Sequence, residues 1–327
     1  MKTVRFFVAA ALALSMMVAC NSSSIVKKAS GLPYEVLVVM SDDAWQGSAG
    51  RAIHKDLTSP IPALTQIEPS MKVSFVKPSL FDGMMTYVRN IVEVKIDPQM
   101  YTKVTLTQEP NKWAQNQKVL TLKAPDTTAI KTYMDKRPHV LSDFFSQAER
   151  ERYITILQKT YSTQVKEKVE EMFGVELRMA PDMTYFKKGK DFLWASNNAN
   201  SGMTSMIMYT FPYTDVKNFS QEYLVSKRDS VLKINLPGSF PDSYMTTEKR
   251  FMLSYEVGEQ DHAYLAVVRG LWKMQGDMMG GPFVSHFVLD EARQRIIAVE
   301  GFVYAPETNK ANYIRRVESA LHTLKLP

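Results

Sequence analysis

The chain has almost no cysteine, and this limits its covalent and metal chemistry. Cys20 is the only cysteine among 327 residues. An intramolecular disulfide needs two, so none holds this fold. A cysteine-rich zinc site is excluded for the same reason. The histidines show neither H-x-H nor H-x₃-H spacing, so the sequence predicts no metal site and no cofactor; they are His54, His139, His262, His286 and His322.

The sequence also lacks the common catalytic and nucleotide-binding motifs. There is no G-x-S-x-G nucleophile elbow and no G-x-x-x-x-G-K-[ST] phosphate loop. Residues 47–50 (GSAG) resemble the elbow but do not have its spacing. We therefore predict no catalytic residue. The sequence favours a protein that is not an enzyme, although an enzyme is not excluded.

Long runs of charge are missing as well. Lysine and arginine number 40 and aspartate and glutamate 34, which gives a formal net charge of +6. Loss of residues 1–19 would remove Lys2 and Arg5 and leave a charge of about +4. Because this mild excess is spread along the chain, we expect no nucleic-acid partner.

The N-terminus carries the strongest positive signal. Lys2 and Arg5 precede an apolar run, 6–18, which is too short for a membrane anchor of about 20 residues. Ala19 and Cys20 follow the run, and this end of the segment resembles a bacterial lipobox. We therefore expect a signal peptide at 1–19, an acylated Cys20 that binds the membrane, and a tether at 20–30. Asn21 is not the aspartate associated with inner-membrane retention, so we expect an outer-membrane protein that faces the periplasm.

Alternating and helical patterns in the rest of the chain predict an α+β fold with largely antiparallel sheets covered by helices. One long helix is expected over 142–173, because apolar residues recur there at every fourth position. We place the boundary between two similar-sized halves after Gly174, as 31–174 and 175–327; one continuous domain is the alternative.

Residues 269–286, RGLWKMQGDMMGGPFVSH, form the most unusual segment. They predict a strand, a glycine-rich loop and a second strand. Ser285 and His286 are adjacent on the second strand, so their side chains point to opposite faces and form no dyad. His286 lies in an apolar row, which is typical of a satisfied core or interface histidine. The simpler interpretation is a connection whose Trp272 and methionines pack onto the sheet; if the segment contacts a partner or ligand instead, we expect Arg269, Trp272 and Asp277 to make the contact.

Methionine clusters suggest one further site. Thioethers suit Cu(I), but methionine also fills irregular cores, and in 205–209 Met206 and Met208 share one strand face. Packing is therefore the simpler interpretation of both clusters, which are Met203, Met206 and Met208, and Met274, Met278 and Met279.

An ordered set of short segments carries a family resemblance. The segments are GLPYEVLVVM at 31–40, W-x-G-x-x-G at 45–50, EPS at 68–70, RNI at 89–91, LPG at 236–238, SYMTT at 243–247, RGLW at 269–272, GGPFVS at 280–285, EGFVYAP at 300–306 and YIRRVE at 313–318. Together they resemble the Bacteroidetes lipoprotein family known as domain of unknown function family 4837. The likeness differs at 277–282, DMMGGP for D-F-M-G-G-P, and at 113–117, WAQNQ for W-A-x-P-Q. It implies a bacterial lipoprotein but no activity, substrate or catalytic residue.

Two functions follow as hypotheses. The first is a non-catalytic lipoprotein that binds an unidentified protein or ligand of the cell envelope. The alternative is an envelope hydrolase whose site is assembled from distant residues, which requires a polar cleft where a base meets a nucleophile or a metal cage.

Overall fold

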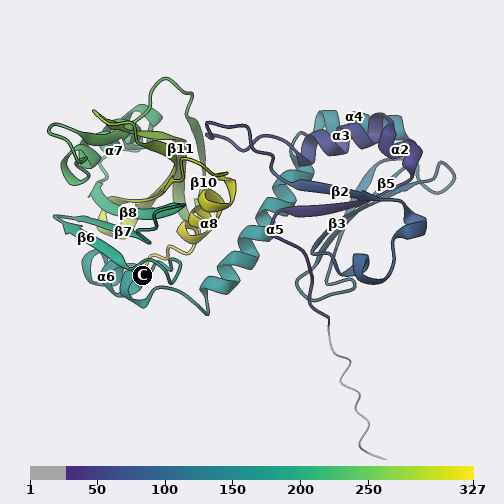
Figure 1. The fold of residues 1–327 in the computed structure, drawn as a ribbon, viewed down its shortest axis with the longest axis horizontal. Helices are drawn as coiled ribbons and strands as arrows, with labels where there is room; N and C mark the ends of the chain where they lie inside the picture. Colours follow the sequence, from purple (N-terminus) through teal and green to yellow (C-terminus); the bar gives the residue numbers. More distant parts are fainter. Residues whose placement is uncertain (1–26) are drawn as a thin grey trace, which may run out of the picture.

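The computed structural model describes residues 27–327, which form two units arranged along the long axis of the molecule (Figure 1). Within this range no helix is both long and apolar enough to cross a membrane. The expected signal peptide and the lipid attachment site at Cys20 lie outside the described residues. Both therefore stay predictions.

The first unit contains a mixed sheet with the strand order β2-β1-β3-β5-β4. β1 pairs in parallel with β2 and β3, β3 pairs in parallel with β5, and β4 runs antiparallel to β5. The elements are β1 (Glu35–Val39), α2 (Asp42–Gln46), α3 (Ser48–Leu57), β2 (Lys72–Val76), η1 (Pro78–Leu80), η2 (Gly83–Tyr87), β3 (Asn90–Ile96), β4 (Thr105–Pro110), β5 (Lys118–Ala124), α4 (Thr127–Lys136) and α5 (Val140–Leu157). The α+β class is confirmed, but this sheet is not largely antiparallel, because α2 and α3 form a crossover between parallel strands.

Both faces of the first sheet are covered, which explains the continuous apolar run in β1. Val36 and Val38 face a core shared with α2, α3, α4 and the start of α5. Leu37 and Val39 face a smaller core that includes Val119.

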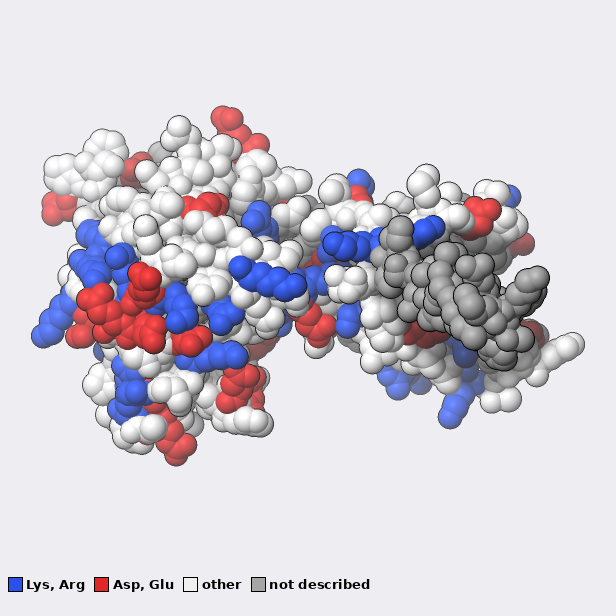
Figure 2. Space-filling model, turned by 90° about the horizontal axis from the view of Figure 1, so that it is seen from below, with Lys and Arg blue, Asp and Glu red and all other residues white. Residues whose placement is uncertain are grey.

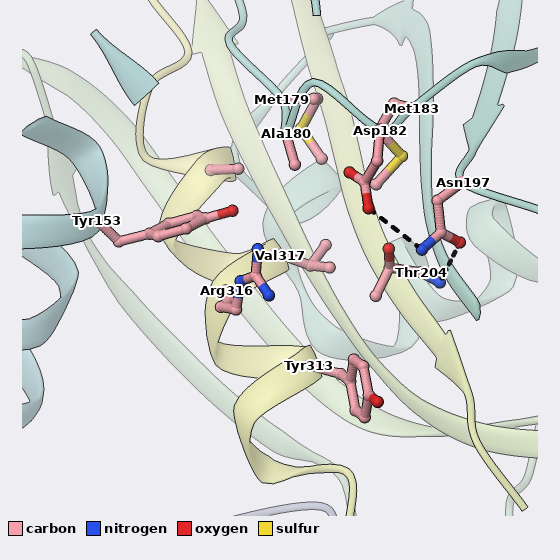
Figure 3. A pocket seen from close by; sticks show the side chains of 11 residues that line it. Tyr153, Met179, Ala180, Asp182, Met183, Asn197, Thr204, Tyr313, Arg316 and Val317 are labelled. Carbon is pink, nitrogen blue, oxygen red and sulfur yellow. Dashed lines mark hydrogen bonds between the residues drawn. The ribbon is translucent and has the colours of Figure 1, made fainter. Parts of the chain in front are cut away.

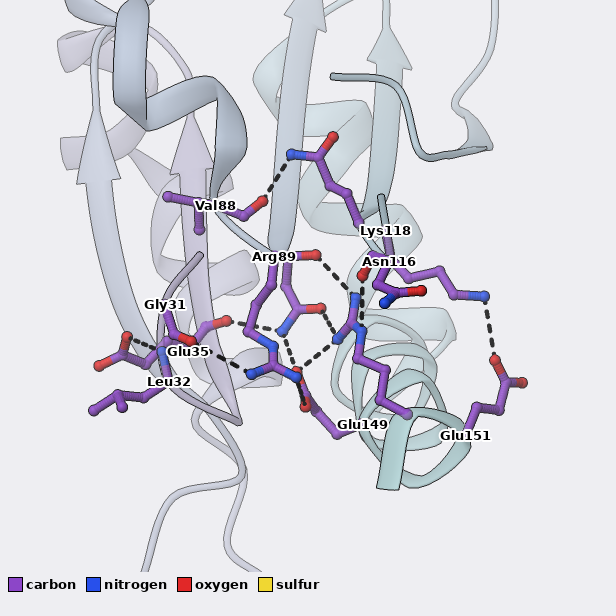
Figure 4. A network of polar contacts seen from close by, with 12 residues as sticks. Gly31, Leu32, Glu35, Val88, Arg89, Asn116, Lys118, Glu149 and Glu151 are labelled. Carbon is purple, nitrogen blue, oxygen red and sulfur yellow. Dashed lines mark hydrogen bonds and ion pairs between the residues drawn. The ribbon is translucent and has the colours of Figure 1, made fainter. Parts of the chain in front are cut away.

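A buried polar network fastens α5 to this sheet (Figure 4). The Glu149 carboxylate is 2.9 Å from Arg89 Nη2 and 2.7 Å from Arg152 Nη1. It also accepts a hydrogen bond of 2.8 Å from Asn90 Nδ2. Because a buried charge is tolerated only with such partners, the network fixes one orientation of α5.

The second unit is built on a larger antiparallel sheet, ordered β10-β11-β12-β13-β8-β7-β6, with β9 paired to β11. Here the predicted antiparallel arrangement is correct. The elements are α6 (Thr163–Phe173), β6 (Tyr185–Gly189), β7 (Phe192–Ser196), β8 (Met203–Pro212), η3 (Val216–Phe219), α7 (Gln221–Asn235), β9 (Tyr244–Thr247), β10 (Ser254–Gln260), β11 (Ala263–Gln275), β12 (Gly280–Asp290), η4 (Glu291–Arg293), β13 (Arg295–Tyr304) and α8 (Ala311–Leu321).

Strand parity divides the core of this unit as the sequence predicts. Phe283 and Phe287 pack in the core on the α7 side of the sheet. Val284 and Val288 pack in the core on the opposite side, which α6 and α8 cover. His286 is in the same row, so it points toward α8.

The single helix expected over 142–173 is wrong. The chain forms α5 and α6 instead, and Ser162 caps the second helix by accepting a hydrogen bond from the Val165 amide. Apolar residues continue at every fourth position across the break, because Leu157 and Val165 pack in the same core of the second unit. A periodic stripe therefore did not reveal the cap between the two helices.

The two units meet along α5 and α8, which pack against each other (Figure 1). A loop between α3 and β2 also crosses to the second unit. Its Glu68 is 5% exposed and accepts hydrogen bonds from the amides of Lys310 (2.8 Å) and Ala311 (3.0 Å). Glu68 thus supplies an acceptor for the first amides of α8, whose own N-cap residue makes no side-chain cap bond.

Candidate functional site

A polar cavity of about 240 Å³ lies where the two units meet. Tyr34 and Arg150 line it from the first unit, and Arg269, Arg315 and Glu318 line it from the second. Tyr34 precedes β1, Arg150 is on α5, Arg269 is on β11, and the other two are on α8. Ligand sites occur preferentially at such junctions between structural units.

Arg269 is held by carboxylates on both sides. Its Nη2 donates a 2.6 Å hydrogen bond to Glu318 Oε1, and its Nη1 is 3.1 Å from Glu256 Oε2. Burial alone would lower the pKa of Arg269, but the two carboxylates outweigh burial and raise it. Burial would likewise raise the pKa of Glu318, but Arg269 and then Arg150 lower it to about 2. Arg269 and Glu318 therefore form a charged pair in the cavity wall.

Arg150 and Arg315 differ from Arg269 because they have no such partners. No carboxylate in the 27–327 range lies within 4.0 Å of either guanidinium group, and neither group makes a hydrogen bond to these residues. Both side chains are half-buried. Burial lowers the pKa of Arg315, although it stays far above neutrality in any protein. Two positive groups with unfilled donors thus border the cavity.

Tyr34 holds Arg315 from one side. The Arg315 guanidinium carbon is 4.1 Å from the centre of the Tyr34 ring, a cation–π arrangement. Burial is the main cause that raises the pKa of Tyr34 to about 12, so its hydroxyl remains a donor. The backbone of Tyr34 has φ +63°, which is strained for a bulky residue and costs about 1–3 kcal/mol. This strained conformation places the ring at the cavity.

Three potential metal ligands converge beside the cavity. His286 is on β12, Glu318 is on α8, and His322 directly follows α8. One donor atom from each lies within 4.8 Å of the others. The two imidazole rings meet edge to face with their centroids 4.6 Å apart. Both ring nitrogens of the fully buried His286 and Nε2 of His322 lack hydrogen-bond partners among the described residues. His286 was expected to be a core histidine with its hydrogen bonds made, but the structure gives it no such partners among the described residues.

The electrostatic environment keeps both imidazoles neutral. Burial is the largest cause that lowers the pKa of His286 well below its ordinary value, and His322 adds to it. Burial and then Arg150 lower the pKa of His322 to about 4. Neutral imidazole is the form that binds metal ions.

The three contact residues predicted from the sequence are not brought together. Arg269 lines the cavity, whereas Trp272 is 2% exposed and donates from Nε1 to the Val303 carbonyl at 3.1 Å. Asp277 is in the turn between β11 and β12, where it accepts from the Met278 amide. Gly281 makes room for the indole, because a Cβ there would lie 2.1 Å from the Val303 oxygen and 3.2 Å from Trp272 Nε1. Trp272 thus holds the hairpin to β13, and contact of a partner with Arg269 or Asp277 stays a prediction.

The methionines of the two sequence clusters do not come together in space. Met206 and Met208 are fully buried in the core on the α8 side of the sheet, as their predicted shared face requires. Met274 and Met279 pack on the α7 side, and Met278 is fully exposed in the turn. The geometry therefore gives no support to a joint thioether site for Cu(I).

Two other hollows lack this combination of size and unpaired cations. The pocket between α5, α8 and β8 has a volume of only about 60 Å³, room for one or two waters, with Arg316, Asp182 and Asn197 along its walls (Figure 3). A groove of about 910 Å³ beside α7 is wider and more open, and it contains no cluster of unpaired cations. On the face shown in Figure 2, basic and acidic side chains are interspersed over both units.

Sequence reasoning missed most of this site. Glu318 and His322 are four residues apart, a spacing that places two side chains on one face of a helix, here α8 and its C-terminal end. That spacing is a signal for paired ligands, which a pattern of histidines alone does not contain. Nothing local connects Arg150 or Tyr34 with this helix, since the contacts depend on how the two units meet. Several segments that carry the family resemblance nevertheless supply lining residues, at 34, 70, 269, 282–284, 314, 315 and 318.

Comparisons with known proteins identify families but no activity. Residues 162–323 match the family described as Domain of unknown function (DUF4837), and residues 29–158 match Domain of unknown function (DUF8532). No curated protein matches the chain. The gap between the matches coincides with the break between α5 and α6, on the N-terminal side of the division predicted after Gly174. The chain therefore belongs to the DUF4837 family through its second unit, and its first unit belongs to the DUF8532 family.

Proposed function

We propose that this protein is a non-catalytic binding protein of the bacterial cell envelope, and that its inter-unit cavity takes a small ligand bearing a carboxylate or phosphate group. The observation that carries this proposal is the pair Arg150 and Arg315, two half-buried guanidinium groups without a carboxylate within 4.0 Å among the described residues. Partly desolvated cations of this kind are stabilised by an anion. Guanidinium groups also suit the planar oxygens of carboxylates and phosphates.

The rest of the wall offers hydroxyl groups but also carboxyl groups that oppose an anion. Ser70 and Ser146 line the cavity and offer hydroxyl donors, whereas the Ser319 hydroxyl in the same wall already donates to the Arg315 carbonyl. Asp143 also lines it, and burial raises the pKa of this carboxyl above its ordinary value. Arg269 balances only one of the two charges of Glu256 and Glu318. The wall thus holds three arginines and three carboxylates, and an anion would bind through the unfilled donors of Arg150 and Arg315 and not through a net positive charge.

Anchoring through Cys20 belongs to the same proposal. The charged, apolar and cysteine-terminated start of the chain supports a lipoprotein at the outer membrane, facing the periplasm. Such an anchor would keep the cavity near the membrane, within reach of envelope components. Metabolic labelling with a palmitate analogue tests it: label should enter the wild type and be lost in Cys20→Ser. Equal labelling of both proteins contradicts lipid attachment at this residue.

Calorimetric titration tests the ligand site. Inorganic phosphate, citrate and glycerol phosphate serve as probes, at low and at physiological ionic strength. Arg150→Met and Arg315→Met should each weaken binding about 10- to 100-fold, because one hydrogen bond to a charged group contributes about 1.5–3 kcal/mol.

Arg316→Met is the matched control. Arg316 is next to Arg315 on the same helix but is exposed and lines the small pocket of Figure 3. Its variant should bind the probes as the wild type does. Equal affinity of the wild type and both cavity variants for every probe would rule out this site.

The alternative is an envelope hydrolase, and a separate observation favours it: the convergence of His286, Glu318 and His322 beside a polar cavity. Two histidines with one glutamate are the ligand set of several zinc hydrolases. Hydrolysis of ester or phosphomonoester probes that a chelator abolishes and Zn²⁺ restores would support this alternative. No turnover by the zinc-loaded protein leaves the binding function as the better account.

A further inference from the structure

We propose that His286, Glu318 and His322 bind one divalent transition-metal ion, with Zn²⁺ as the best fit. The site shares Glu318 with the wall of the proposed ligand site, but neither histidine lines the cavity. Metal binding can therefore be measured separately from ligand binding.

The unpaired nitrogens are the first argument. His286 is fully buried, and neither Nδ1 nor Nε2 has a partner within the described part of the chain. Nε2 of His322 is also buried without a partner. Buried polar atoms of folded proteins are paired in the great majority of cases, so three unsatisfied nitrogens in one cluster require an explanation. An ion bound between the two rings would satisfy a nitrogen on each.

The second argument is the ligand set and its support. Two imidazoles and one carboxylate form the three-ligand set that zinc takes in open sites, and imidazole also suits Cu, Fe and Ni. His286 is fixed on a central strand, while Glu318 and His322 are one helical turn apart, so two separate elements hold the ligands. Arg269 donates to Glu318 Oε1 at 2.6 Å, which orients the carboxylate and leaves Oε2 for the ion.

Charge is the main opposing effect. Arg269 is close enough to repel a cation, but Glu256 lies 3.1 Å from its Nη1 and offsets that charge. Arg150 adds a further positive charge nearby. Since the fixed cations weaken binding of a second cation, we expect a moderate affinity and not that of a buried structural zinc site.

Access to the site comes from the cavity. Glu318 lines the cavity and its side chain is 14% exposed, whereas His286 is completely covered. An ion can therefore reach the carboxylate first and the histidines behind it. This arrangement also places one ligand at the surface that the small-molecule probes would touch.

The test uses the full chain, purified in mild detergent and stripped with a chelator, in a buffer free of phosphate and carboxylates. Competition with a chromogenic chelator should give one Zn²⁺ per chain with a Kd below about 1 µM. His322→Ala and Glu318→Gln should each weaken binding by more than about 100-fold, because loss of a group that merely orients a ligand already costs 10- to 100-fold.

His262→Ala is the matched control. His262 is 99% exposed and lies 3.1 Å from Glu259, so it offers a surface imidazole–carboxylate pair outside the cluster. Its variant should bind Zn²⁺ as the wild type does. Circular dichroism and thermal unfolding check that each variant is folded.

A second readout does not depend on variants. Cu²⁺ added to the stripped wild type at one equivalent should give pulsed EPR couplings from two coordinated imidazoles. Zinc affinity unchanged by both cluster variants, or wild-type binding weaker than about 10 µM together with couplings from fewer than two imidazoles, would overturn the proposal. Because no anionic probe is present, a failure here leaves the ligand-binding proposal untouched, and the reverse also holds.

Discussion

Glu68→Ala should loosen the start of α8 and with it the wall of the inter-unit cavity. Glu68 is 5% exposed and accepts hydrogen bonds from the amides of Lys310 and Ala311 at 2.8 and 3.0 Å. A hydrogen bond to a charged group contributes about 1.5–3 kcal/mol, and loss of an N-terminal cap costs about 0.5–2 kcal/mol. Since the two bonds form one cap, we expect a loss of about 2–4 kcal/mol. Glu68→Gln keeps one acceptor oxygen and should lose about 1–2 kcal/mol.

Hydrogen exchange locates the effect and denaturant unfolding gives its size. Peptides that contain residues 310 and 311 should exchange much faster in Glu68→Ala, while peptides from β3 and β5 stay protected. Arg315 and Glu318 follow on the same helix, so probe binding at the cavity should weaken too. Unchanged exchange at 310 and 311, with a stability loss below about 0.5 kcal/mol, would refute the role assigned to this cap.

Three further predictions test the supporting structure. Gly281→Ala should destabilise the fold by more than about 2 kcal/mol in denaturant unfolding, because its Cβ would lie 2.1 Å from a carbonyl oxygen of β13. Gly258→Ala is the control and should be nearly neutral, because no atom lies within 4 Å of its Cβ. Glu300→Gln should cost about 2–4 kcal/mol in the same assay. The fully buried Arg228 is 2.6 Å from both Glu300 carboxylate oxygens and would keep only Asp229, 3.6 Å from its Nη1, as a counter-ion among the described residues; a loss under about 1 kcal/mol would contradict this. Burial is the main cause that raises the pKa of Asp56 above its ordinary 3.8. The contribution of Asp56 to the free energy of unfolding is therefore fully present below pH 3.8, and it is lost as the pH rises through the folded-state pKa. Relative to Asp56→Asn, the wild type should therefore lose stability across that window, and a difference that does not vary with pH would show that burial does not perturb this carboxyl.

Local patterns predicted the elements of this fold well. The strand–loop–strand arrangement of 269–286 appears as β11, a turn and β12, and the row containing Val284, His286 and Val288 faces one core. These features depend on residues that are near in sequence. The parallel pairing of the first sheet depends instead on how α2 and α3 return the chain, which no strand pattern records.

The candidate site could be predicted only in part. Arg269 was identified, but as one of three residues in a single loop, because spacing alone cannot distinguish Trp272 packed under β13 from Trp272 at a surface. His286 was placed in the correct row but judged satisfied, since the partner of a buried imidazole comes from α8, more than 30 residues later. Arg150 and Arg315 lie on different units, and only the joint between the units makes them neighbours of one cavity.

The most direct test of the central claim is to recover the ligand itself. The wild type and the Arg150→Met/Arg315→Met double variant are isolated from the native envelope, and the small molecules released on denaturation are compared by mass spectrometry. A carboxylate- or phosphate-bearing compound should leave the wild type at close to one equivalent and be depleted in the double variant. Equal recovery from the two proteins, or no anionic compound from the wild type, would contradict a cavity built for an anion.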